Sequence, residues 1–338
     1  MLEAAPRLSS ARDATPPLLA VEAISVFFQL PAQALFSRNF PRLHAVEDVS
    51  FTLAPRETLG IVGESGSGKT TTARAVMLRV KLNRGRIHFD GRDVTDLAGE
   101  ELRRMRRHMQ FVFQDPYGSL NARMTVLDSV AEPLIVHGLA KRPKDARAKV
   151  VSLLETVGLP ADALDRYPHA FSGGQRQRIG IARALAISPE LIVADEPVSS
   201  LDVSVRAQVV NLLQDLQQRL GLTYLFIAHD LAIVRHISHR IAIMYAGRIV
   251  EVGSRDSIYD SPRHPYTQAL LAAVLEPDPT AARARPRQLV AAEPPNVIDP
   301  GPGCRYQARC PLARDRCRRE TPALTPRATD HLVACFER

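Results

Sequence analysis

The stretch Thr58-Leu-Gly-Ile-Val-Gly-Glu-Ser-Gly-Ser-Gly-Lys-Thr70 decides the fold. Thr58–Val62 is a short apolar run typical of a buried strand, and residues 63–70 fit the pattern G-x-x-x-x-G-K-[ST] of a phosphate-binding loop. Residues 70–82 carry Ala, Arg, Met and Leu at a spacing of three to four, which predicts a helix. Glycines let backbone N–H groups face phosphate oxygens, and a helix N-terminus adds positive charge. The stretch therefore predicts a nucleotide site.

The phosphate-binding loop supplies most of the expected nucleotide ligands. We expect Lys69 to reach the β- and γ-phosphates and the Thr70 hydroxyl to bind Mg²⁺. The residues assigned to nucleotide binding here are Gly63, Glu64, Ser65, Gly66, Ser67, Gly68, Lys69, Thr70 and Thr71.

A second short apolar run, Leu191-Ile-Val-Ala194, ends in two carboxylates, Asp195 and Glu196. We expect Asp195 to hold Mg²⁺ directly or through water, and Glu196 to orient and polarise the attacking water. A positioned base contributes about 10²–10⁴ in rate. Together with the phosphate-binding loop, the two carboxylates predict a nucleoside triphosphatase.

Strands and helices alternate around these motifs, which predicts an α/β domain with a largely parallel core over residues 19–275. Residues 1–18 are rich in Pro, Ser, Ala and Arg and are expected to be disordered. No run reaches the eighteen apolar residues of a spanning helix, and the start has no apolar core for a signal peptide. The net charge of +8 permits nucleic acid as a partner, but no aromatic-basic RNA motif or DNA-reading helix supports one, so none is expected.

Residues 276–338 differ from the rest of the chain. From Arg283 onward there are eleven arginines against six acidic residues, so about +5 of the net charge of +8 lies there. All four cysteines follow at the spacing C-x₅-C-x₆-C-x₁₇-C, and in a reducing cytosol they suggest a metal rather than a disulfide. No pair has the C-x₂-C spacing of zinc knuckles, so we expect a [4Fe–4S] cluster, with Zn²⁺ or four free thiols as alternatives. The expected ligands are Cys304, Cys310, Cys317 and Cys335, and the arginines expected to offset the cluster's charge are Arg305, Arg309, Arg314, Arg316 and Arg318.

Phe171-Ser-Gly-Gly-Gln-Arg-Gln-Arg-Ile-Gly-Ile-Ala-Arg183 resembles the signature of ATP-binding-cassette (ABC) ATPases, and it lies just ahead of the Asp-Glu strand, as in that family. The resemblance implies ATP and Mg²⁺ as ligands. It also implies an α/β, P-loop fold with a RecA-like parallel core, an antiparallel β subdomain and a helical subdomain at about residues 115–185. A small Cys-rich C-terminal extension would follow this cassette.

The family's other motifs occur in the same order and imply roles for single residues. Gln114 is similar to the Q-loop glutamine, which contacts metal and water and senses the transmembrane partner. His229 is similar to the switch histidine that contacts the γ-phosphate, and Phe28, or alternatively Phe27, would stack on adenine. The residues implied to act in catalysis are Glu196, His229, Gln114 and Lys69, and those implied to bind Mg²⁺ are Thr70, Gln114 and Asp195. The signature and D-loop residues implied to contact ATP are Ser172, Gly173, Gly174, Gln175 and Asp202.

Asp260–Leu271, Gly303–Pro311 and His331–Cys335 resemble the C-terminal extension of ATPases that drive di- and oligopeptide importers. The resemblance implies ATP hydrolysis that energises peptide uptake from the cytoplasmic face of the inner membrane. Its partners would be a second ATPase subunit in a heterodimer, two transmembrane permeases and an extracytoplasmic substrate-binding protein. An importer of nickel or another small solute, and a soluble non-transport ABC ATPase, are the alternatives. The chain departs from the family pattern at Thr70, where Ser is commoner, and at Asn121-Ala-Arg123, where Asn-Pro-Arg is typical.

Overall fold

The computed structural model describes residues 16–31, 40–115, 117–273 and 296–338. The N-terminal segment expected to be disordered lies outside the described residues up to residue 15. The expected boundary between residues 275 and 276 lies outside them as well.

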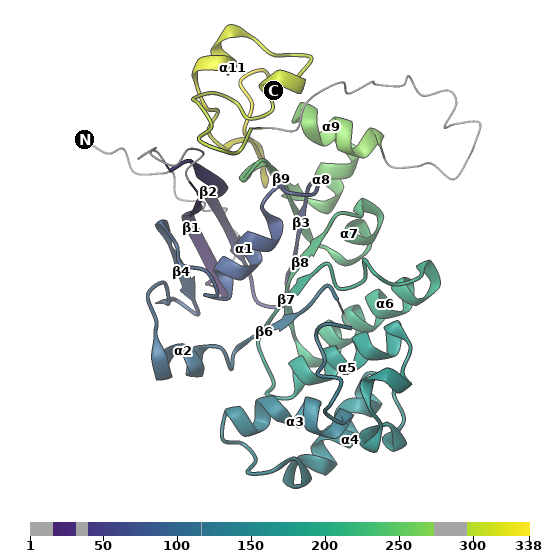
Figure 1. The fold of residues 1–338 in the computed structure, drawn as a ribbon. Coiled ribbons are helices and arrows are strands. Elements are labelled where there is room, and N and C mark those ends of the chain that lie inside the picture. Colours follow the sequence, from purple (N-terminus) through teal and green to yellow (C-terminus); the bar gives the residue numbers. More distant parts are fainter. Residues whose placement is uncertain (1–15, 32–39, 116, 274–295) are drawn as a thin grey trace, which may run out of the picture.

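The larger of the two sheets forms the centre of the molecule, with the strand order β11-β12-β10-β9-β3-β8-β7-β6 (Figure 1). Its middle strands β9, β3, β8, β7 and β6 are parallel to one another. Short, continuously apolar runs form these strands because helices cover both faces of a parallel sheet. Their bounds are β3 (Thr58–Val62), β6 (Met109–Val112), β7 (Leu191–Asp195), β8 (Thr223–Ala228) and β9 (Arg240–Tyr245).

The smaller sheet is antiparallel, with the order β2-β1-β4-β5. Its strands are β1 (Leu19–Gln29), β2 (Arg42–Leu53), β4 (Arg84–Phe89) and β5 (Arg92–Asp93). Helix α1 (Lys69–Val76) contacts strands of both sheets, and an apolar core that includes Leu19, Phe51 and Leu59 joins them. The phosphate-binding loop at the start of α1 is therefore held between two sheets.

A group of helices lies at the end of the molecule remote from the C-terminus (Figure 1). Capping boxes set the starts of two of them, since Thr125 and Asp128 exchange hydrogen bonds at α3, and Ser172 and Gln175 do so at α5. The helices of this group are α3 (Val126–Val136), α4 (Arg147–Thr156) and α5 (Gly173–Leu185). Other α-helices of the cassette within the described residues are α2 (Gly99–Met105), α6 (Val203–Leu220), α7 (Leu231–Ile237), α8 (Arg255–Asp260) and α9 (Pro265–Ala272). Short 3-10 helices are η1 (Pro143–Ala146), η2 (Ala161–Asp165) and η3 (Pro168–Ala170).

The C-terminal extension is joined to the central sheet. Strand β12 (His331–Val333) pairs antiparallel with β10 (Arg248–Ser254), and β11 (Thr325–Ala328) pairs with β12. His331 and Glu251 fix this junction through a fully buried contact of 2.7 Å between Nε2 and a carboxylate oxygen. The short helices of the extension are η4 (Gln307–Arg309) and α11 (Asp315–Arg319). The extension therefore sits against the same layer that carries the phosphate-binding loop.

Candidate active site

The phosphate-binding loop follows β3 and opens at the carboxyl ends of the parallel strands, the edge where α/β sheets bind ligands. Gly68 has φ +102°, and a Cβ there would meet the Ala45 carbonyl oxygen at 2.2 Å. Only glycine satisfies both conditions, because other residues rarely adopt such a φ and no side chain fits that gap. The glycine therefore fixes the backbone of the loop at the position expected to face the phosphates.

Lys69 lies beneath the loop and is almost fully buried. Its Nζ donates hydrogen bonds of 2.8 Å to the Gly63 carbonyl and 2.8 Å to the Glu64 carbonyl. Burial lowers the pKa of Lys69, whereas the nearby carboxylates of Glu196 and Asp195 raise it. The ammonium group is thus already aimed along the loop that would bind the phosphates.

Thr70 and Asp195 form the oxygen pair expected to bind magnesium. The Thr70 hydroxyl donates to an Asp195 carboxylate oxygen at 3.1 Å. Burial raises the pKa of Asp195, and the hydrogen bond from Thr70 opposes that shift. A hydroxyl and a carboxylate at the phosphate loop suit Mg²⁺, which prefers oxygen ligands and is bound by few protein groups beside phosphates.

Glu196 brings the remaining predicted catalytic residues together. One oxygen of its carboxylate accepts a hydrogen bond of 3.1 Å from the Gln114 amide and lies 3.1 Å from His229 Nδ1. Its backbone has φ +46°, and its N–H donates to the Ile227 carbonyl at 2.8 Å. The three side chains follow β6, β7 and β8, neighbouring strands of one sheet. The mostly buried carboxylate is thus oriented from two sides.

The signature residues lie apart from the phosphate-binding loop of the same chain. Ser172 caps α5 in the group of helices, while the loop precedes α1 on the other side of the central sheet (Figure 1). Gly174 packs so closely on α6 that a Cβ would meet Val205 Cγ1 at 2.2 Å. Asp202 stands at the N-cap of α6, and the Ser200 hydroxyl donates to the Gln114 carbonyl at 3.3 Å. One chain therefore presents two separate halves of the predicted site.

The predicted adenine-stacking residues lie near the end of β1. Phe28 is 41% exposed, whereas the Phe27 ring packs on His44 with the ring centroids 4.2 Å apart. The exposed ring of Phe28 leaves it free to stack on a base, so the assignment stays a prediction with a suitable side chain.

Sequence reasoning missed two contacts on the phosphate-binding loop. The Glu64 carboxylate accepts two hydrogen bonds from Arg309, and the Glu64 backbone N–H donates to the Tyr266 hydroxyl at 2.9 Å. Both partners come from the C-terminal part of the chain, so no local sequence pattern could have indicated them. Glu64 therefore offers neither its N–H nor a free carboxylate to a nucleotide in this structure.

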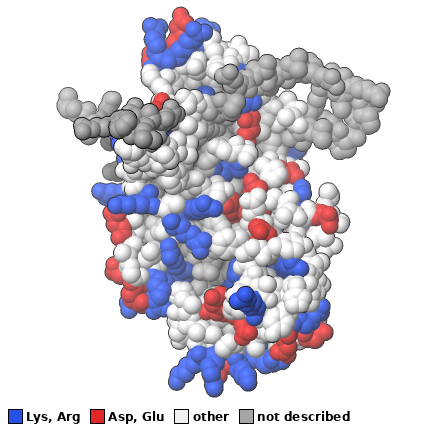
Figure 2. Space-filling model, in the orientation of Figure 1, with Lys and Arg blue, Asp and Glu red and all other residues white. Residues whose placement is uncertain are grey.

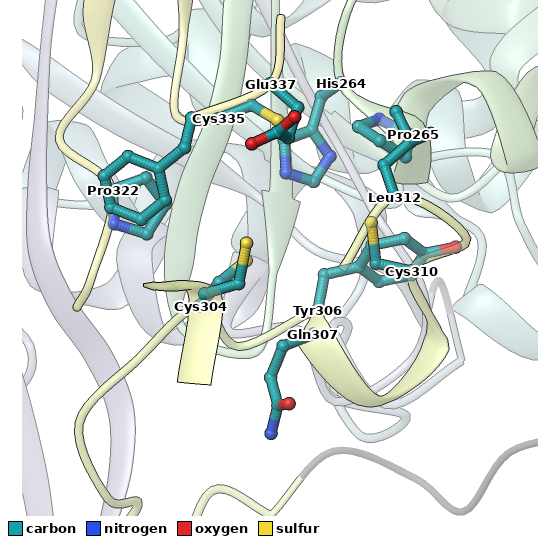
Figure 3. Close-up of a pocket in the computed structure, with 12 residues that line it drawn as sticks. His264, Pro265, Cys304, Tyr306, Gln307, Cys310, Leu312, Pro322, Cys335 and Glu337 are labelled. Carbon is teal, nitrogen blue, oxygen red and sulfur yellow. The ribbon is translucent and has the colours of Figure 1, made fainter. Parts of the chain in front are cut away.

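The prediction of an iron–sulfur cluster is wrong. The thiols of Cys304, Cys310, Cys317 and Cys335 line one pocket with Tyr306 (Figure 3). Its cavity volume is about 10 Å³, roughly the space for one water-sized sphere. Among the residues that the structure describes, no three Cys, His, Asp or Glu side chains are placed to hold one metal ion, so the same finding counts against zinc.

Burial raises the pKa of the Cys304 thiol to about 11, and it also raises the pKa of Cys310 and Cys335. Of the arginines expected to offset the cluster's charge, Arg305 and Arg309 pair with Glu47 and Glu64 instead.

Charged side chains of both signs share the face drawn in Figure 2, with blue and red atoms close together over the extension and over the group of helices. The positive net charge therefore does not form a single stripe on this face.

Within the described ranges, no helix has the length and apolar character needed to span a bilayer.

Comparisons with known proteins agree with this arrangement. Residues 46–199 match the model of the ABC transporter family, and residues 250–317 match the model of the oligopeptide/dipeptide transporter C-terminal region. A post-hydrolysis dimer of an ATP-binding cassette with ADP and phosphate superposes with a TM-score of 0.60 and 28% identity, covering 70% of this chain and 98% of that one. The cassette CbiO1 of Clostridium perfringens gives a TM-score of 0.62 at 25% identity, covering 72% of this chain and 91% of that one.

Curated relatives match over nearly the whole chain. A probable peptide ABC transporter ATP-binding protein of Sinorhizobium fredii is 50% identical, covering 95% of this chain and 90% of the relative. The oligopeptide transport ATP-binding protein AppF of Bacillus subtilis is 48% identical, covering 89% of this chain and 92% of the relative. The oligopeptide transport ATP-binding protein OppF of Salmonella typhimurium is 46% identical, covering 95% of this chain and 96% of the relative. With the phosphate-binding loop, the Asp-Glu strand and the signature in place, the chain belongs to the ABC ATPases, in the family of oligopeptide/dipeptide transporter ATP-binding proteins.

Proposed function

We propose that this chain hydrolyses ATP to energise the import of di- or oligopeptides across the cytoplasmic membrane. The observation that carries the proposal is the Glu196 carboxylate, held between Gln114 and His229 beside the Thr70–Asp195 pair. The match of residues 250–317 to the C-terminal region of oligopeptide/dipeptide transporters supports peptide as the substrate class.

In the proposed reaction, Lys69 binds the β- and γ-phosphates while the phosphate-loop N–H groups surround them. Thr70, Asp195 and Gln114 would hold Mg²⁺, which offsets phosphate charge when bound. Glu196 orients the attacking water and accepts its proton. His229 keeps the Glu196 carboxylate in place and reaches the γ-phosphate. Such positioning and charge stabilisation supply most of the rate in phosphoryl transfer.

The chain would act with a second cassette. Since the signature and the phosphate-binding loop lie apart in one chain, Ser172, Gly173 and Gly174 would contact ATP held by a partner ATPase subunit, in a heterodimer. A similar cassette has been solved as a dimer with ADP and phosphate, which supports the pairing of two cassettes. Two permeases and an extracytoplasmic binding protein would complete the importer, with this chain on the cytoplasmic face of the inner membrane.

Glu196→Gln tests the proposed water-orienting role. The amide keeps the shape of the side chain but cannot accept the proton, so kcat for ATP hydrolysis is expected to fall by about 10²–10⁴. The Kd for MgATP should stay near the wild-type value, because Glu196 belongs to the hydrolytic step. Glu190→Gln is the matched control, since Glu190 is an exposed partner of His108. Undiminished hydrolysis by Glu196→Gln would overturn the assignment.

Transport assays test the substrate class. In vesicles that contain the whole importer, ATP-dependent accumulation should be seen with labelled di- or oligopeptides and should cease with Glu196→Gln. Accumulation of nickel without peptide would contradict peptide as the substrate while leaving the ATPase assignment intact.

A further inference from the structure

The C-terminal extension reaches the phosphate-binding loop through one guanidinium group. Arg309 Nη1 and Nη2 donate to the two carboxylate oxygens of Glu64 at 2.9 and 3.1 Å. This paired geometry is stronger and more directional than a single contact between point charges. Arg309 is only 15% exposed and Glu64 is 41% exposed, so the pair lies at the edge of solvent and is partly screened.

A platform of aromatic rings holds the Arg309 guanidinium in place. Its central carbon lies 5.9 Å from the ring centroids of both Tyr245 and Tyr306. Tyr266 packs against both rings, at 4.5 Å from Tyr245 and 5.4 Å from Tyr306. The Tyr266 hydroxyl also accepts a hydrogen bond from the Glu64 N–H. The backbone of Glu64 is thus bound by the platform itself, and its carboxylate is bound by the arginine that lies on the platform. The Glu64 hydrogen bonds raise the pKa of Arg309.

A second anchor ties the other side of the loop to the same region. Arg305 pairs with Glu47, which also accepts from Arg248 at 2.7 Å. The Glu47 N–H donates to the Gly247 carbonyl, and the Gly247 N–H donates to the Ser67 carbonyl at 2.9 Å. Glu64 and Ser67 are thus both held by segments that pack against the extension.

Charge gives the Glu64–Arg309 pair a consequence for nucleotide binding. A carboxylate on a loop that must accept a polyanionic triphosphate repels it, because like charges close together are unfavourable where water is partly excluded. Burial lowers the pKa of Lys69, and the charge of Glu64 opposes that shift together with the charges of Glu196 and Asp195, so the Glu64 carboxylate already acts on this region. Arg309 supplies the opposite charge at a fixed place and turns the Glu64 carboxylate toward the extension.

We propose that Arg309 is a positioning residue for nucleotide binding that neutralises the Glu64 carboxylate. It thereby couples docking of the C-terminal extension on the cassette to nucleotide occupancy of the phosphate-binding loop. The inference rests on the nucleotide site proposed above. By linkage, a docked extension strengthens nucleotide binding, and bound nucleotide stabilises the docked extension by the same factor.

Nucleotide titrations of the full chain test the inference. Arg309→Gln is expected to raise the Kd for MgATP by about three- to tenfold, in the lower part of the range for coupled residues because the pair is partly exposed. The loss should be smaller for ADP and absent for adenosine, because it follows the charge on the phosphates. Arg309→Lys should recover part of the affinity, since it keeps the charge but not the paired contact.

The combination with Glu64→Gln separates a charge effect from a merely structural one. In the Arg309→Gln background, Glu64→Gln should restore most of the MgATP affinity, because it removes the carboxylate that was left unpaired. In steady-state assays, Arg309→Gln should raise KM for MgATP and leave kcat within about twofold of wild type, the pattern of lost uniform binding.

Arg316→Gln is the matched control, since Arg316 pairs with Glu320 on the exposed side of the same extension. It should change neither Kd nor KM. An equal loss for ATP, ADP and adenosine, or no restoration by Glu64→Gln, would overturn the role of Arg309. Lys69→Ala should abolish tight MgATP binding in any case, and its failure to do so would overturn the nucleotide site instead.

Discussion

At the scale of the residue, Gly68 limits what the phosphate-binding loop tolerates. We predict that Gly68→Ala loses measurable MgATP binding. The side chain would carry φ +102° and place its Cβ 2.2 Å from the Ala45 carbonyl oxygen. The left-handed conformation alone costs about 1–2 kcal/mol for a non-glycine residue, and the backbone contact adds to it. Equilibrium binding of a fluorescent ATP analogue is the measurement.

Gly91→Ala provides the control for that substitution. Gly91 also has a positive φ, +72°, but nothing lies within 4 Å of a Cβ placed there. It should lose only about 1 kcal/mol of stability and keep nucleotide affinity. Equal loss of binding in both variants would show that strain, and not the approach of Ala45, decides the outcome.

The residues of the site differ in how far sequence could predict them. Glu196, Gln114 and His229 follow neighbouring parallel strands, and the carboxyl ends of such strands meet at one edge, so their grouping follows from topology. Arg309 reaches Glu64 from 245 positions away, a pairing that no local pattern encodes. The cysteine spacing suggested a cluster, and that prediction failed. Spacing gives the separation of the thiols along the chain but not the volume that they enclose in the fold.

At the scale of the element, apolar periodicity predicted helices whose ends lie elsewhere. The expected helix 70–82 is α1, which ends at Val76, and Leu78 has φ +52°. Val80 and Leu82 continue the apolar spacing only because they pack on the core from the following loop. Helix α9 begins at Pro265, and its N-cap is His264, a residue type outside the usual capping set of Ser, Thr, Asp and Asn.

That histidine, His264, makes the free energy of unfolding depend on pH. It is 1% exposed, and its Nδ1 accepts the Tyr266 N–H at 3.0 Å. Burial lowers the pKa of His264 to about 4, whereas an unfolded histidine titrates near 6.5. Between these values the unfolded chain binds a proton that the folded chain does not. The free energy of unfolding therefore falls as pH drops through this window, by about 1.4 kcal/mol per pH unit.

His264→Asn tests this dependence, since asparagine can still cap the helix without titrating. Between pH 7.5 and pH 5, wild type should lose about 2 kcal/mol more unfolding free energy than the variant, measured with urea. His236→Asn is the control, because His236 pairs with Asn211 on an exposed surface. A wild type and a His264→Asn variant with parallel pH profiles would contradict the assignment.

At the scale of the whole molecule, the extension completes the central sheet. Composition marked residues 276–338 as different, but the three-residue strand β12 carries no signal strong enough to predict that it pairs with β10. Long-range pairing decides its conformation, since His331 meets Glu251 in the interior and Val333 is fully buried. The extension therefore belongs to the same sheet as β3, β6, β7 and β8, the strands that lead into the phosphate-binding loop, Gln114, Glu196 and His229.

This continuity predicts the effect of removing the extension. A chain that ends at Ala273 would leave β10 without its partner β12 and would uncover the rings that pack on Tyr306. An unpaired edge strand with apolar neighbours recruits other chains. We expect the shortened chain to unfold at a lower temperature and to associate in light-scattering measurements, while full-length Arg316→Gln behaves as wild type. A shortened chain that stays monomeric and as stable as wild type would show that β10 does not need its neighbour, and that the extension is an appendage to a self-sufficient sheet.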